Sequence, residues 1–246
     1  MNQRPASSKA SFGKKAKDYE AHAFVQADAA EWLAEWIRPL ECKNCLELGA
    51  GTGLLTRYLE NRFEHLECSD IEPAMVEICR SKFPEATHSV RDAWAKQPDT
   101  GKWDLVAASS VLQWANDPKA VMQNWRELLS PNGRILAGLF VKPSLPEMSE
   151  VTGGKSPLIW RDIPAWKSIF EAAGLQIVRI ESKTKRYSYK SGLDFWKSIH
   201  GTGASVSRKI SPSQMIRFFR NYDSKFRDET GVYATWTFCR VELLRQ

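Results

Sequence analysis

Seven residues in the first quarter of the chain have the types and spacing of a ligand-binding loop. Residues 47–53 read Glu-Leu-Gly-Ala-Gly-Thr-Gly, follow a short apolar stretch typical of a strand and precede leucines at helical spacing. Glycine lets the backbone approach a bound molecule closely. The spacing differs from the G-x-G-x-x-G of dinucleotide loops, and a carboxylate at Glu47 repels pyrophosphate but attracts an amino or sulfonium group. We therefore expect Gly49, Gly51 and Gly53 to line a site for a ligand with a cationic end.

Further polar residues stand where other predicted strands end. Asp70 and Ile71 follow a predicted strand at 65–69, Asp92 and Ala93 come after one at 86–90, and Ser109 ends another at 103–109. The carboxyl ends of parallel strands meet at one edge of a sheet, where ligands bind. We therefore expect these side chains to lie beside the glycine loop.

The elements that position these residues alternate between strands and helices. This alternation predicts an α/β fold with a Rossmann-like, mostly parallel seven-stranded sheet and helices on both faces. We interpret residues 1–246 as one domain, with a helical cap at 10–40 and a helical lid inserted at 183–231, because that segment is too long for a plain connection. Strands are expected at 44–48, 65–69, 86–90, 103–109, 134–141, 175–182 and 233–244, and helices at 18–38, 53–62, from 73, 117–129, 164–173, 191–200 and 211–222.

The glycine loop with its leading acid resembles motif I of the class I S-adenosylmethionine-dependent methyltransferases. The resemblance implies that S-adenosylmethionine is the cofactor and S-adenosylhomocysteine the product. It also implies that Asp70 accepts hydrogen bonds from the ribose hydroxyls, Ile71 stacks on adenine and Asp92 meets the adenine amino group. The cofactor-binding set is then Glu47, Gly49, Gly51, Gly53, Asp70, Ile71, Asp92, Ala93 and Ser109.

Over residues 10–245 the chain resembles the malonyl-acyl carrier protein O-methyltransferases of biotin synthesis. The opening residues 12–26, the Leu-Gln-Trp of 112–114, the Ser-Leu-Pro-Glu of 144–147 and the segment 198–204 are similar to family segments. The lid segment has His200 where the family has Lys, and residues 153–163 depart from its pattern, which affects acceptor specificity rather than cofactor binding.

The resemblance implies transfer of a methyl group to the free carboxylate of a malonyl thioester. That carboxylate is ionised at neutral pH, so the reaction needs orientation and exclusion of water rather than a general base. Tyr19, Gln113, Trp114 and His200 are the residues expected to line the acceptor cavity, and the face of Trp114 is suited to stabilising a sulfonium.

Two other functions compete with this one. A class I methyltransferase acting on a free small acid or a quinone-type carbon fits the same loop. A nucleic-acid-binding protein with a vestigial methyltransferase fold fits the basic second half. Base methylation is not supported, because residues 109–114 lack the Asn/Asp-Pro-Pro-aromatic motif and a cysteine nucleophile.

Charge is divided unevenly along the chain. Residues 1–150 carry 18 Lys and Arg against 21 Asp and Glu, and the remainder carries 17 against 8, so the net charges are −3 and +9. The resemblance implies an acidic acyl carrier protein as partner, docked on the basic lid region, with no nucleic acid and no membrane. The docking residues are predicted to be Lys183, Lys185, Arg186, Lys190, Arg208 and Lys209.

Composition sets the remaining expectations. No apolar run approaches the roughly 20 residues of a membrane-spanning helix, and the amino-terminal residues lack the apolar core of a secretory signal. Five cysteines without a second Cys-x-x-Cys or a histidine pair after Cys42 and Cys45 predict free thiols and no metal site. We expect a cytoplasmic protein.

Overall fold

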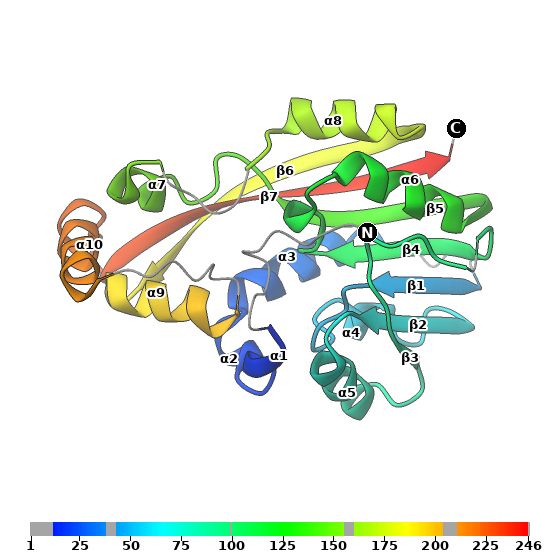
Figure 1. The fold of residues 1–246 in the computed structure, drawn as a ribbon, viewed down its shortest axis with the longest axis horizontal. Coiled ribbons are helices and arrows are strands. Elements are labelled where there is room, and N and C mark those ends of the chain that lie inside the picture. Colours follow the sequence, from blue (N-terminus) through cyan, green and yellow to red (C-terminus); the bar gives the residue numbers. More distant parts are fainter. Residues whose placement is uncertain (1–11, 38–42, 99, 155–159, 204–210, 246) are drawn as a thin grey trace.

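One twisted sheet of seven strands forms the centre of the molecule (Figure 1). A computed structural model describes residues 12–37, 43–98, 100–154, 160–203 and 211–245. The strand order is β3-β2-β1-β4-β5-β7-β6, parallel from β3 to β5, with β7 antiparallel to β5 and β6. The strands are β1 (Asn44–Leu48), β2 (His65–Asp70), β3 (Thr87–Val90), β4 (Trp103–Ser109), β5 (Leu129–Phe140), β6 (Leu175–Tyr189) and β7 (Val232–Arg245). The predicted fold class is confirmed.

Helices cover both faces of this sheet. The helices are α1 (Phe12–Lys15), α2 (Tyr19–His22), α3 (Phe24–Ala34), α4 (Thr56–Leu59), α5 (Pro73–Lys82), α6 (Pro118–Leu128), α7 (Pro146–Thr152), α8 (Ile163–Ala172), α9 (Gly192–Gly201) and α10 (Pro212–Lys225), with a 3-10 helix, η2 (Leu112–Trp114). No helix among the described residues is long and apolar enough to cross a membrane.

Alternate residues of the central strands face two separate apolar cores. Leu46 and Leu48 of β1 belong to the core under α6 and α8, whereas Cys45 belongs to the core under α3, α4 and α5. Strands buried on both faces are therefore apolar almost throughout, which is why β1 and β4 could be recognised in the sequence. Glu47, on the same face as Cys45, is an exception to this pattern.

The two carboxyl-terminal strands extend beyond the rest of the sheet and carry a separate group of helices. The ends of β6 and β7 project towards α7, α9 and α10 at one end of the molecule (Figure 1). Aromatic rings join these elements, with Phe195 of α9 stacked on Tyr222 of α10 at 4.9 Å and Trp236 of β7 at 4.9 Å from Phe140. The helices of the predicted lid thus rest on a well-packed aromatic cluster.

Several elements differ from expectation. β5 begins at Leu129 and not at residue 134. The helix predicted at 53–62 is only one turn, because the chain is still in the glycine loop at its start. The helix predicted at 18–38 is divided at Ala23 into α2 and α3, and α7 was not predicted. Residues 183–189, assigned to the lid, continue β6 and pair with β7. The helical part of the predicted insertion therefore begins at α9.

Candidate functional site

The glycine loop leaves open space at its middle residue. All three glycines have positive φ, but a Cβ on Gly53 would lie 2.2 Å from Phe83, and one on Gly49 would lie 2.4 Å from Val111. A Cβ on Gly51, at φ 58°, would meet nothing within 4 Å. Packing therefore explains Gly49 and Gly53, whereas the backbone at Gly51 is free to face a ligand.

Asp70 ties the end of β2 to this loop. Its Oδ2 accepts a hydrogen bond from the backbone N–H of Gly51 at 3.0 Å, and its Oδ1 accepts one from Glu72 at 2.9 Å. Burial raises the pKa of Asp70 above its usual value, an effect that these two N–H donors oppose. The carboxylate is thus fixed beside Gly51, as the predicted site requires.

Glu47 lies deeper than the loop. Its carboxylate is buried and accepts a hydrogen bond from Thr56 Oγ1 at 2.6 Å, while Cys68 Sγ lies 3.8 Å from the same Oε2. Burial raises the pKa of Glu47 to about 8. Thr56 and Cys68 thus contact Glu47 from the protein interior beneath the glycine loop. A direct contact between Glu47 and a cationic ligand stays a prediction.

The ends of β3 and β2 lie side by side, which brings Asp92 near Asp70. The Arg91 N–H donates to the carbonyl of Asp70 at 2.9 Å, and Asp92 Oδ1 accepts from the Trp94 N–H at 2.9 Å. Half-buried Ile71 directly follows Asp70. The carbonyl of Ala93 accepts a hydrogen bond from Trp125 Nε1, which attaches this loop to α6.

Buried polar atoms without a hydrogen-bond partner gather after β4. Ser109 Oγ, Ser110 Oγ and Gln113 Oε1 are buried and have no partner among the described residues. Gln113 Nε2 donates to the carbonyl of Ser110 at 2.8 Å, and Ser110 has a positive φ of 62°. Trp114 is half-buried in the same short helix, η2. Because buried polar groups normally find partners, these atoms indicate a place for a polar ligand or for water.

The amino-terminal helices close over the loop. The pKa of Tyr19 is raised above its usual value, mainly by burial and then by the negative charge of Asp70, so the phenol lies near the cofactor-side carboxylate. Glu20, the next residue, accepts a hydrogen bond from Thr52 Oγ1 at 2.8 Å and pairs with Lys82 of α5. The sequence prediction missed this connection, because Glu20 is far from Thr52 and Lys82 along the chain and belongs to no recognisable motif.

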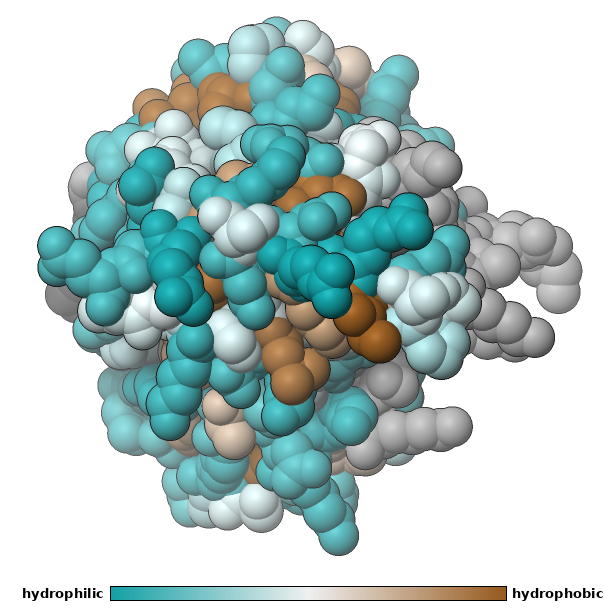
Figure 2. Space-filling model, turned by 90° about the vertical axis from the view of Figure 1, so that its left-hand side faces the viewer, coloured by the Kyte–Doolittle hydropathy of each residue, from teal (hydrophilic) through white to brown (hydrophobic). Residues whose placement is uncertain are grey.

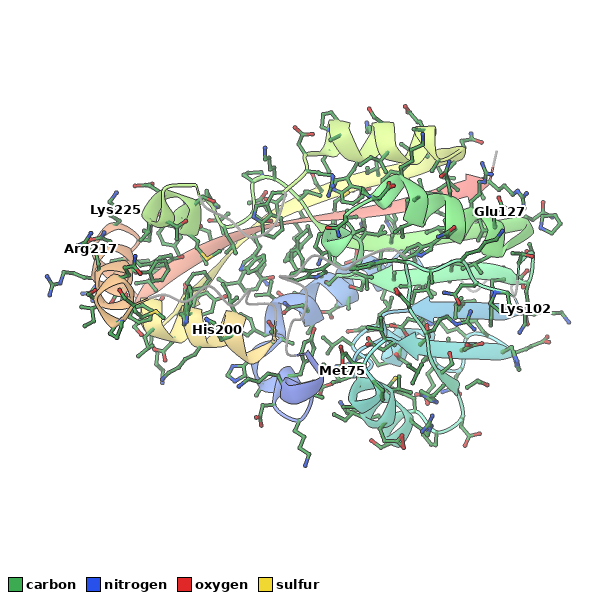
Figure 3. All side chains as sticks on the ribbon, in the orientation of Figure 1. Met75, Lys102, Glu127, His200, Arg217 and Lys225 are labelled. Atoms are coloured by element: carbon green, nitrogen blue, oxygen red, sulfur yellow. The ribbon has the colours of Figure 1, made fainter. Side chains whose placement is uncertain are left out.

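His200 reaches the same region from α9 (Figure 3). Its ring lies 4.4 Å from that of Trp196, and its buried Nε2 has no partner among the described residues. Burial and then Lys15 lower the pKa of His200. A Cβ on Gly201 would lie 2.1 Å from His22, so α9 packs directly on α2. Tyr19 and His200 thus come from touching elements, while Gln113 and Trp114 come from the end of β4.

Comparisons with known proteins identify the type of enzyme. The chain is 25% identical over 257 residues to the malonyl-acyl carrier protein O-methyltransferase of Paenibacillus sp., which covers 92% of this chain and 93% of that one. It is 29% identical over 249 residues to the biotin biosynthesis bifunctional protein BioCD of Bordetella avium, covering 92% of this chain and 53% of that one. Residues 46–135 match the family described as a methyltransferase domain. This chain is an S-adenosylmethionine-dependent methyltransferase.

Solved structures agree on the fold of this methyltransferase. A methyltransferase structure from Bacillus halodurans aligns with a TM-score of 0.66 at 11% identity, covering 87% of this chain and 97% of that one. The cyclase SpnF aligns with a TM-score of 0.58 at 16% identity, over 89% of this chain and 81% of that one. A cyclase among the neighbours illustrates that this fold does not by itself specify the reaction.

The residues on this edge of the sheet fit S-adenosylmethionine. The open backbone at Gly51 and the fixed carboxylate of Asp70 are expected to hold its ribose and amino acid parts, and the unpartnered polar atoms after β4 lie on a neighbouring strand end. The chain has the seven-stranded sheet of the class I methyltransferase fold. The role of each residue of the cofactor-binding set stays a prediction.

We expect Asp70→Ala to weaken S-adenosylmethionine binding about tenfold or more, because hydrogen bonds to a charged group contribute roughly 1.5 to 3 kcal/mol. Titration calorimetry measures this affinity. Asp104→Ala is a matched control, since Asp104 also accepts two backbone N–H bonds, from Lys43 at 2.9 Å and Asn44 at 3.0 Å, but at the opposite ends of the strands. Equal affinities of the two variants would contradict the assignment of Asp70.

Proposed function

We propose that this methyltransferase esterifies the free carboxylate of a malonyl group carried on an acyl carrier protein. The observation that carries the proposal is the extent of the similarity. It spans 92% of this chain and 93% of a relative of that name, including the lid region and not only the shared methyltransferase domain. The similarity to BioCD points to biotin synthesis as the setting.

The side chains predicted to line the acceptor cavity suit a carboxylate nucleophile. The raised pKa of Tyr19 keeps its phenol protonated, and the lowered pKa of His200 keeps its imidazole largely neutral at pH 7. With Gln113 these residues are uncharged hydrogen-bonding groups. They can orient an ionised carboxylate by hydrogen bonds alone, and a neutral partner lowers its nucleophilicity less than a contacting cation would. The carboxylate is already ionised, so no proton has to be removed from it.

Catalysis in this proposal is mainly orientation. Bound S-adenosylmethionine supplies an electrophilic methyl group on a sulfonium. Tyr19, Gln113 and His200 align the acceptor oxygen with it, an effect that contributes several kcal/mol in well-oriented reactions. Trp114 offers an aromatic face to the positive charge. The packing of α9 on α2 supports a role for these helices in keeping water out of the cavity.

The lid is the mobile part of this mechanism in our proposal. Residues 190–231 include α9 and α10, and the proposed hinges are Gly192 at the start of α9 and Gly203 just after its end. We expect amides of α9 to become more protected from hydrogen exchange when S-adenosylhomocysteine and acceptor are both bound. Amides of α6, which lies on the other part of the sheet, serve as the reference. Equal protection of α9 with and without the ligands would show that the lid does not close.

The proposed docking surface is narrower than the sequence suggested. Lys183 and Lys185 lie on one face of β6 and Arg186 on the other, because side chains alternate along a strand. Lys185 is already paired with Asp28 of α3. Lys190 is exposed and immediately precedes the cap of α9. Arg208 and Lys209 lie outside the described residues. Of these residues, Arg186 and Lys190 lie nearest to α9 along the chain, and we propose that they guide an acidic carrier.

A comparison of acceptors tests the proposed function. Malonyl-acyl carrier protein, malonyl-coenzyme A and free malonate are each supplied with S-adenosylmethionine, and methyl ester formation is measured. We expect the highest kcat/KM for the carrier-bound acceptor, because only that acceptor can use a protein docking surface. A preference for free malonate or for a quinone-type acceptor would favour a small-molecule methyltransferase instead.

A further inference from the structure

A compact group of sulfur, nitrogen and carboxylate ligands lies beneath the glycine loop. Glu47, Cys68 and His88 occupy adjacent positions across three parallel strands, since Glu47 pairs in register with Cys68 and Cys68 with His88. Side chains at paired positions of neighbouring strands share one face of a sheet. Cys79 of α5, the helix that covers this face, completes the group.

The distances within this group suit a tetrahedral metal ion. One ligand atom each from Cys68, Cys79 and His88 lie within 4.8 Å of one another. The Oε2 atom of Glu47 lies 3.8 Å from Cys68 Sγ. In a tetrahedral zinc site, the usual zinc–ligand bond lengths give ligand-to-ligand separations of about 3.3 to 3.8 Å. Shifts of about an ångström would therefore bring these three side chains around one ion. Glu47 lies beside Cys68 but outside this group of three, so its carboxylate would have to turn towards the ion to become a fourth ligand.

Burial and ligand type favour the same conclusion. Cys68 and Cys79 are each 1% exposed. His88 Nε2 is buried and has no hydrogen-bond partner among the described residues. Thr56 Oγ1 donates to Glu47 Oε2 at 2.6 Å and lies 3.6 Å from Cys79 Sγ, so a second layer of contacts already orients the carboxylate. Two thiols and an imidazole bind zinc in preference to magnesium or calcium, which favour oxygen ligands.

We propose that Cys68, Cys79 and His88 bind a structural zinc ion, with Glu47 as the fourth ligand. Binding requires both thiols as thiolates and Glu47 as a carboxylate, and the protons that these three groups carry are released to solvent. The ion would join β1, β2, β3 and α5, the elements that hold the glycine loop and Asp70 in place. As a zinc ligand, Glu47 would act on the cofactor only by holding the glycine loop in place, instead of through the direct contact predicted from the sequence. The presence of the ion can be measured without any acceptor.

The sequence did not indicate this site, and the predicted absence of metal rested on Cys42 and Cys45. Cys42 lies outside the described residues, and Cys45 belongs to the core under α3. The three proposed ligands are spaced eleven and nine residues apart, at 68, 79 and 88, which matches no finger spacing. Only the pairing of β1, β2 and β3 brings them together.

Metal content of the whole chain tests the proposal. Because both cysteines are buried, the protein is produced under reducing conditions in medium supplemented with zinc or with cobalt, so that the metal is available during folding. We expect one zinc per chain by elemental analysis. The cobalt protein should show thiolate-to-cobalt charge-transfer absorption and an intense visible band typical of tetrahedral cobalt.

Variants distinguish this site from adventitious binding. Cys68→Ser and Cys79→Ser should lose the metal and the charge-transfer absorption, whereas Cys239→Ser, at an equally buried strand cysteine in the other core, should keep both. The proposal would be overturned if wild-type protein produced with cobalt contained no cobalt. It would also be overturned if the charge-transfer bands persisted in the Cys68→Ser/Cys79→Ser variant. If the serine variants do not fold, the spectrum and stoichiometry of the wild type decide alone. Failure of the malonyl acceptor assay leaves these readouts unchanged.

Discussion

Gly51→Val is expected to abolish S-adenosylmethionine binding while leaving the sheet folded. The new side chain meets no protein atom, because a Cβ on Gly51 has nothing within 4 Å, and so it occupies the space from which the ligand must approach the backbone. Substitution at a positive φ also strains the backbone, by about 1 to 2 kcal/mol. Titration calorimetry with S-adenosylhomocysteine and the melting temperature separate these two effects.

Gly101→Val is the matched control for this experiment. Gly101 has a similar φ of 71°, also has nothing within 4 Å of an added Cβ, and lies just before β4, next to Lys102 at the opposite edge of the sheet from the loop (Figure 3). It should suffer the same backbone strain and keep full affinity. If both variants bind equally well, the glycine loop does not hold the ligand.

Much of the fold was predictable because the strands are buried on both faces. β1 and β4 are short, mostly apolar stretches that lead into Gly49 and end at Ser109, and their ends were predicted to within a few residues. The far half of β6 was not predicted, because residues 183–189 are mostly exposed and charged on an edge strand, and only their pairing with β7 makes them a strand. Apolar periodicity carries no information about such a segment.

The candidate site was predictable where a motif coincides with the end of a strand. The loop around Gly51 and the position of Asp70 beside it follow from this rule, and the hydrogen bond between them agrees with it. Contacts between segments that are distant along the chain could not be predicted from such motifs. Glu20 reaches Thr52 and Lys82, and His200 comes near α2, only because helices from both ends of the chain pack over the sheet.

The end of the molecule that carries α9 and α10 determines which charges an approaching protein meets first. Hydrophilic side chains cover most of this end (Figure 2), and Arg217 and Lys225 of α10 lie at its outer edge (Figure 3). Lys225 is paired with Glu150 of the α7 region. Since an acidic partner responds to uncompensated charge, Arg186 and Lys190 between β6 and α9 are the residues to reverse.

We expect Arg186→Glu/Lys190→Glu to lower kcat/KM for malonyl-acyl carrier protein about tenfold or more at low salt, mainly through slower association. The effect on free malonate should be small, since that acceptor needs no protein docking. Lys102→Glu/Lys167→Glu, at exposed residues before β4 and on α8, changes net charge equally and should have little effect. Exposed charges are screened beyond about 8 Å at physiological ionic strength, so added salt should reduce the wild-type rate towards that of the reversed variant. If kcat/KM for malonyl-acyl carrier protein changes neither with the charge reversal nor with salt, these cations form only a solvated surface. This result would also favour a free acid over a carrier-bound acceptor.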